Sequence, residues 1–145
     1  MRPFPVCSSQ RRPANSSPGA QLPGSLPTEL ACVEHLRHLY LSGNGLNGNL
    51  PAALLLNATE LHVLLIASND LSGALPDASY ARVLQELNLS DNALAGWLPT
   101  TLLRAPGLAV LGLANNYLAG ELPTMGHEDE VFVEMTKRDI GGARR

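Results

Sequence analysis

The sequence predicts a solenoid of the α/β class, in which short strands stack side by side into one parallel sheet. A unit of about 24 residues recurs along the middle of the chain, as in LYLSGNGLNGNLP at 39–51 and LNLSDNALAGWLP at 87–99. Inside each unit a Leu-x-Leu alternation has the period of two that is typical of a half-buried strand. A unit this short cannot bury its apolar face alone, so successive copies must stack.

An asparagine marks the same place in every copy. The anchors are Asn44, Asn69, Asn92 and Asn116, at intervals of 25, 23 and 24 residues. Leucine or isoleucine stands three and five residues before each anchor, leucine two residues after it, glycine four after it, and a Leu-Pro pair at six and seven after it. Agreement of this kind across four copies indicates an internal repeat, which outranks other sequence signals.

The asparagines are predicted to be structural. Each one stands where the chain leaves its strand and turns, so backbone N–H and C=O groups lose their ladder partners. A carboxamide has two donor hydrogens and an acceptor oxygen, and we expect it to bond to the turn of its own coil and of the next. A catalytic or ligand-binding role is disfavoured, because four equivalent positions indicate repeated architecture. The glycine column fits positive φ or close backbone approach, and the proline column allows at most a short or interrupted second strand.

The pattern LxxLxxLxLxxNxLxGxLPxxL resembles the plant-type leucine-rich repeat of receptor-like kinase and receptor-like protein ectodomains and of polygalacturonase-inhibiting proteins. The resemblance implies an α/β solenoid with a parallel sheet on the concave face and short 3-10 or irregular segments on the convex face. Such ectodomains usually begin with a signal peptide and a Cys-bearing cap, which are not recognisable here. No kinase motif or membrane helix follows Pro123. A short or truncated member of the family is therefore expected.

Composition changes along the chain predict three regions. Residues 1–21 are rich in Pro, Ser and Arg without periodicity and are expected to form a disordered arm. Residues 22–123 hold about four repeats, and 124–145 form an irregular tail of acidic and then basic character. Within this tail, VFVEM at 131–135 is either a last strand that partly caps the stack or irregular chain. Cys7 and Cys32 allow one bridge or two free thiols.

Charge and hydropathy exclude several classes of function. A net charge of −3 and a pI near 5.7 argue against a nucleic-acid partner. No apolar run approaches the roughly 18 residues of a membrane span, and the N-terminal stretch lacks the apolar region of a secretory signal. The family resemblance nevertheless implies an extracellular or cell-surface location. Sequons at Asn57 and Asn88 are candidate glycosylation sites if the protein is exported.

Catalytic chemistry is not expected. His35 and His38 are spaced as a His-x-x-His pair, but no Cys or carboxylate repeats at ligand spacing beside them. The HEDE run at 127–130 is interpreted as a solvated charge run. Nucleophile elbows, phosphate loops and zinc-protease motifs do not occur. The protein is therefore predicted to be a non-enzyme without a cofactor or metal.

Binding of another protein through the concave sheet is the leading hypothesis. The candidate solvent-facing contacts are Arg37, His38, Tyr40, Leu65, Glu86, Asn88 and Tyr117. Four strands about 4.8 Å apart span only about 14 Å, which favours a partner that touches several coils over a long peptide. The alternatives are an inhibitor of a wall hydrolase, resembling polygalacturonase inhibitors, and a truncated product without a partner.

Overall fold

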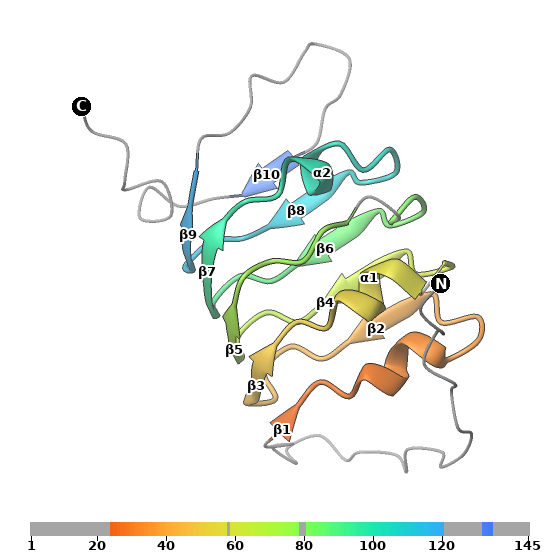
Figure 1. Ribbon diagram of the computed structural model, residues 1–145, viewed down its shortest axis with the longest axis horizontal. Coiled ribbons are helices and arrows are strands. Elements are labelled where there is room, and N and C mark those ends of the chain that lie inside the picture. Colours follow the sequence, from red (N-terminus) through yellow and green to blue (C-terminus); the bar gives the residue numbers. More distant parts are fainter. Residues whose placement is uncertain (1–23, 58, 79–80, 121–131, 135–145) are drawn as a thin grey trace, which may run out of the picture.

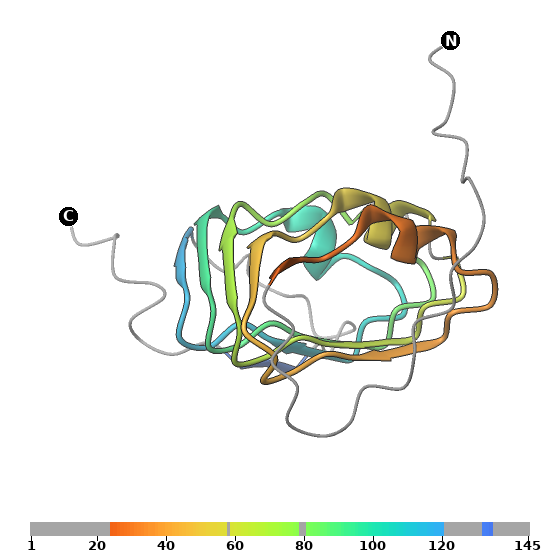
Figure 2. The same ribbon diagram turned by 90° about the horizontal axis from the view of Figure 1, so that it is seen from below.

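The computed structural model describes residues 24–57, 59–78, 81–120 and 132–134 of the 145-residue chain. These segments form successive coils that stack along one axis (Figure 1). Seen from below, the coils enclose a flattened ring of three walls: a first sheet, a second sheet beside it, and helical segments opposite the first sheet (Figure 2). The predicted solenoid is confirmed.

The first sheet, called here the concave sheet, contains one short strand from each coil. Its members are β2 (His38–Tyr40), β4 (Val63–Leu65), β6 (Glu86–Asn88), β8 (Val110–Gly112) and β10 (Phe132–Glu134). They pair in parallel in the order β10-β8-β6-β4-β2. The strand β10 lies within the segment for which a last strand was one of two expectations. The limits of the predicted arm and tail fall outside the described residues and stay predictions.

The second sheet, called here the side sheet, runs along the adjoining wall. Its members are β1 (Gly24–Ser25), β3 (Leu46–Asn49), β5 (Asp70–Gly73), β7 (Ala93–Trp97) and β9 (Tyr117–Ala119), paired in parallel in that order. Its strands are short, as the proline column predicted. Gly48, Gly73 and Gly96 have φ of 77°, 81° and 94°, which confirms that this column needs the left-handed region.

The convex wall opposite the concave sheet consists of short helices. These are the 3-10 helix η1 (Thr28–Cys32) and the α-helices α1 (Ala52–Asn57) and α2 (Thr100–Leu103). Pro51 and Pro99 stand directly before α1 and α2, where a fixed φ favours a helix start and the missing N–H costs nothing. Their leucines face the core: Leu54, Leu55, Leu102 and Leu103 are all buried.

Leucines from the concave strands fill the space between the three walls. Leu64, Leu87 and Leu111 have no exposed surface, and the same is true of Ile66, Leu89 and Leu113. This is the inward face that the Leu-x-Leu alternation predicted. The outward-facing side chains of the same strands are therefore supported by a closely packed core.

Candidate functional site

Hydrogen bonds from the asparagine column hold the edge of the concave sheet. Asn69 is buried, and its Nδ2 donates to two carbonyl oxygens of its own turn. The same Nδ2 donates to the carbonyl of Leu41 in the preceding coil at 2.9 Å. Its Oδ1 accepts from the backbone N–H groups of Asn44 and Leu46, both at 3.0 Å. One side chain therefore supplies partners to two turns at once.

The asparagine side chains bond to the preceding coil. The expectation that they bond to the next coil was therefore wrong. Asn92 Nδ2 donates to Ile66 O at 3.0 Å, and Asn92 Oδ1 accepts from the N–H of Leu71 at 3.0 Å. Asn116 bonds in the same way to the coil before its own. Asn44 belongs to the first of these coils, and its Nδ2 donates to two carbonyls of its own turn, Leu41 and Ser42. The side chain thus reaches backward, because the end of the preceding turn leaves those groups without a ladder partner.

The strand register assembles most of the predicted contacts into two outward rows. Tyr40, Leu65, Asn88 and Gly112 align in one row across β2, β4, β6 and β8. His38, Val63, Glu86 and Val110 align in the other. Arg37 directly precedes β2 and is exposed. Six of the seven predicted contacts therefore lie on or beside one sheet face.

The row that contains Tyr40 changes character along the sheet. Tyr40 is 63% exposed, whereas its neighbour Leu65 is half-buried. Asn88 is also half-buried, which corrects the expectation of a freely solvent-facing side chain. Its Oδ1 accepts from the N–H of Ser90 at 3.0 Å and lies 2.6 Å from where a Cβ at Gly112 would stand. The glycine thus leaves room for the carboxamide to lie against the sheet.

Tyr117 was placed on the concave face by sequence, and the structure corrects this. It begins β9 in the side sheet and is 75% exposed. The chain has already passed the turn at Asn116 and entered the adjoining wall. Sequence analysis expected at most a short or interrupted second strand here, because strands this short show no alternation pattern.

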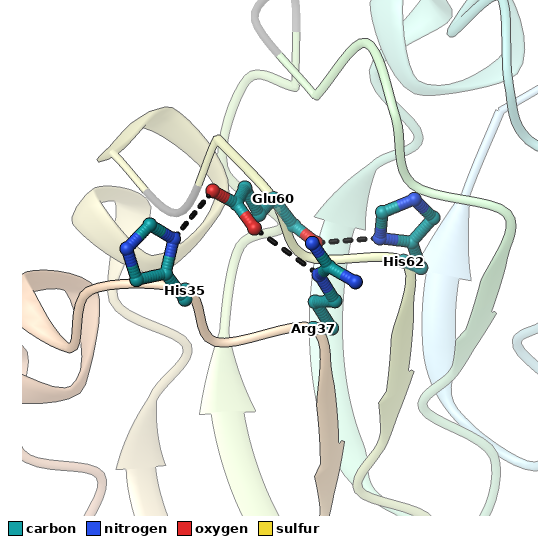
Figure 3. A network of polar contacts seen from close by, with 4 residues as sticks. All are labelled: His35, Arg37, Glu60 and His62. Atoms are coloured by element: carbon teal, nitrogen blue, oxygen red, sulfur yellow. Dashed lines mark hydrogen bonds and ion pairs between the residues drawn. The ribbon is translucent and has the colours of Figure 1, made fainter.

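A charged network that sequence reasoning missed lies beside β2 and β4 (Figure 3). His35 Nδ1 donates to Oε1 of Glu60 at 2.7 Å, and Arg37 Nε donates to Oε2 at 3.1 Å. His62 Nδ1 contacts the backbone oxygen of Glu60 at 2.5 Å. The hydrogen bond from His35, followed by that from Arg37, lowers the pKa of Glu60 from its ordinary value of 4.5. His35 and Glu60 are 25 residues apart, which is one repeat interval. Aligning the repeats therefore places the two residues side by side.

Several other sequence-based predictions concern residues that the structure describes only in part. Among the residues that the structure describes, no group of three His, Cys, Asp or Glu side chains is arranged to hold a metal ion. No helix in the described segments is long and apolar enough to cross a membrane. Cys32 is exposed and has no disulfide partner within those segments. Cys7, the HEDE run at 127–130 and the side chain of Asn57 lie outside the described part.

Comparison with known proteins agrees with this geometry. The family model of the Leucine Rich Repeat matches residues 35–55 and 83–104. Receptor-like protein 35 of Arabidopsis thaliana is 36% identical over 90 residues, which are 62% of this chain and 9% of that protein. The chain contains leucine-rich repeats of the plant type, similar to those of receptor-like proteins. This leucine-rich-repeat protein spans about a tenth of the length of its curated relative.

Solved structures with the same fold include plant receptor ectodomains and a plant ice-binding protein. The ectodomain of the receptor kinase SOBIR1 from Arabidopsis thaliana superposes with a TM-score of 0.71 at 28% identity, covering 80% of this chain and 64% of that one. The Arabidopsis receptor kinase HAESA, in complex with the peptide hormone IDA and the co-receptor SERK1, gives a TM-score of 0.68 at 26% identity. That match covers 77% of this leucine-rich-repeat protein and 20% of the other chain.

Proposed function

We propose that this leucine-rich-repeat protein is a non-catalytic module that binds another protein through its concave sheet. The carrying observation is the pair of outward rows, which places an exposed aromatic ring next to aliphatic, amide and carboxylate side chains. Aromatic side chains on a rigid base are common anchors of protein interfaces. The HAESA complex, with its hormone and co-receptor, supports this class of partner.

The dimensions of the sheet favour a folded partner. The five concave strands, about 4.8 Å apart, span about 19 Å, which an extended peptide crosses in about six residues. Because the contacts lie on several coils and in two rows, a protein surface engages more of them than a single extended segment does. The hydrolase-inhibitor alternative needs a cationic cluster, and the guanidinium of Arg37 is bound to Glu60.

We propose further that the module works at the cell surface, as the receptor-like relative suggests. Asn57, the last residue of α1, lies on the convex wall, where a glycan leaves the concave rows free. Asn88 lies within the concave sheet and is half-buried. After secretion from plant cells, intact mass should show a glycan removed by Asn57→Gln and no glycan at Asn88. Glycan occupancy at Asn88 would obstruct the concave rows and would contradict their use as a binding face.

Capture of a partner tests the concave site. The wild-type chain, a Tyr40→Ala/Leu65→Ala variant and a Leu56→Ala control are immobilised and exposed to plant extract. Leu56 is a partly exposed apolar residue of α1 on the convex wall, so the control removes apolar surface elsewhere. We expect proteins that wild type and control retain equally and the double variant loses. Equal capture by the double variant would remove the concave site from consideration.

A further inference from the structure

The side sheet carries two highly exposed aromatic residues that the protein-binding proposal does not use. Trp97 is 76% exposed at the end of β7, and Tyr117 is 75% exposed at the start of β9. These strands are neighbours in the sheet (Figure 1), with Ala95 opposite Tyr117 and Trp97 opposite Ala119. Trp97 and Tyr117 are therefore diagonal neighbours, with Cα atoms roughly 8 Å apart.

Within β7 and β9, the residues beside the two rings are small and uncharged. The positions paired with them are alanines: Ala95 lies opposite Tyr117 and Ala119 lies opposite Trp97. A Cβ at Gly120 would lie 3.4 Å from Cε3 of Trp97, so this glycine lets the indole lie against the end of β9. Within the bounds of β7 and β9 no residue is ionisable apart from the Tyr117 phenol.

This composition is particular to the last coils of the side sheet. The earlier strands β3 and β5 place Asn47, Asn49 and Asp70 at exposed positions. The aromatic residues therefore do not follow from the repeat pattern, which specifies only the leucine and glycine columns here. Two exposed rings side by side on adjacent strands are a local feature with its own chemistry.

We infer that Trp97 and Tyr117 form a platform that binds a neutral oligosaccharide of pyranose rings. The face of an aromatic ring is electronegative, and the C–H bonds on the flat face of a pyranose carry partial positive charge, so the two stack. The Tyr117 hydroxyl can donate to or accept from a sugar hydroxyl. The absence of carboxylates and cations within these strands favours a neutral sugar over a charged one.

The size of the platform argues against a protein or a second copy as the occupant. A stable protein interface buries about 800 Å² on each partner. Two aromatic side chains contribute at most about 250 Å² each, and the alanines and glycines around them add little. An oligosaccharide needs only the two ring faces. The platform lies on a different wall from the concave rows. The two proposed binding sites can therefore be tested independently.

Binding can be followed by the fluorescence of Trp97, because it is the only tryptophan in the chain. Cellohexaose and xylohexaose are titrated into the full 145-residue chain while tryptophan emission is followed, with an oligogalacturonate of equal length as the charged comparison. We expect a saturable change in emission with a neutral oligosaccharide and a much weaker response to the charged one. Isothermal titration calorimetry then measures the same affinity without the fluorophore.

Matched variants separate the platform from other surfaces. Tyr117→Ala should weaken binding roughly tenfold, the upper range for one aromatic contact, and Trp97→Ala should abolish the calorimetric signal. Tyr40→Ala removes an exposed aromatic residue from the concave sheet and should leave the affinity unchanged. Circular dichroism verifies that each variant folds, and Trp97→Phe, which keeps a ring, should retain partial binding if Trp97→Ala unfolds.

Three outcomes would overturn the proposal. The first is no response to either neutral oligosaccharide at millimolar concentration, and the second is equal affinity of wild type and Trp97→Ala. The third is a dimer, seen by analytical ultracentrifugation, that Trp97→Ala dissociates, which would assign the rings to a second copy. Loss of protein capture by the Tyr40→Ala/Leu65→Ala variant is scored separately, so failure of one site is distinguishable from failure of the other.

Discussion

The first coil of the solenoid and the coils after it share one sequence pattern but are packed differently. Leu39 in the first concave strand is half-buried, whereas Leu64 in the next strand has no exposed surface. Among the described residues, the Asn44 side chain bonds to its own turn, whereas the Asn69 side chain also bonds to the turn before it. A repeat column therefore contributes stability according to its neighbours, so equivalent residues contribute unequal free energies of unfolding.

The largest difference is expected for the asparagine of an inner coil. Asn92→Ala leaves the buried N–H of Leu71 without its partner and removes bonds to three carbonyls. Since an unsatisfied buried group costs about 1–3 kcal/mol, we expect a loss of about 3 kcal/mol in the free energy of unfolding. Urea unfolding followed by circular dichroism measures it. Asn88→Ala, at a half-buried position, is the control, and equal effects of the two changes would refute the buried-turn assignment.

Two glycines with positive φ differ in what surrounds them. Gly73 has φ of 81°, and an added Cβ would force the exposed side chain of Asn49 in the preceding coil to move. Gly43 has φ of 71° with open space around it. Gly73→Ala should therefore lower the free energy of unfolding by about 2 kcal/mol and Gly43→Ala by about 1 kcal/mol. Thermal melts of both variants test this order, and a larger effect at Gly43 would contradict it.

The asparagine of the first coil should matter less than its inner equivalents. Asn44 is half-buried, and the carbonyl of Leu41 keeps its bond from Asn69 when Asn44 is changed. Asn44→Ala should therefore cost about 1 kcal/mol, again measured by urea unfolding. A loss as large as that of Asn92→Ala would show that the position of a coil in the stack does not set the strength of the column.

The smallest effect is expected from Glu60, which links the first two coils at the surface. Its pKa is lowered in the folded state, so its contribution is fully present above the unfolded value and is lost as the pH falls through the folded value. Glu60→Gln should lower the urea midpoint slightly at pH 7, and the difference from wild type should shrink as the pH is lowered below 4.5. Salt should reduce the effect, because the pair is exposed. Glu34→Gln, an exposed neighbour, should change nothing over the same pH range.

Periodicity explains why much of the fold and part of the site were predictable. The repeat interval equals the register between strands, so aligned columns bring Tyr40 beside Leu65 and His38 beside Val63. The side sheet was anticipated only as an interrupted strand, because a strand of two to five residues with glycine at positive φ shows no alternation. Tyr117 was assigned to the wrong sheet because the side sheet was not fully anticipated. Glu60 stands one repeat after His35, but the equivalent positions in the later coils, Val83 and Gly107, are uncharged, so the pair forms no repeated charged column.

Periodicity alone was enough to determine the length of the coil, the inward leucines and the turn position of each asparagine, since these depend on contacts repeated in every unit. Stacking decided the rest: the backward direction of the asparagine bridges, the weaker packing of the first coil, and the wall that presents Trp97 and Tyr117. The physical reason is that these features depend on what lies against a coil. Two identical stretches of sequence differ in this respect whenever their neighbours differ.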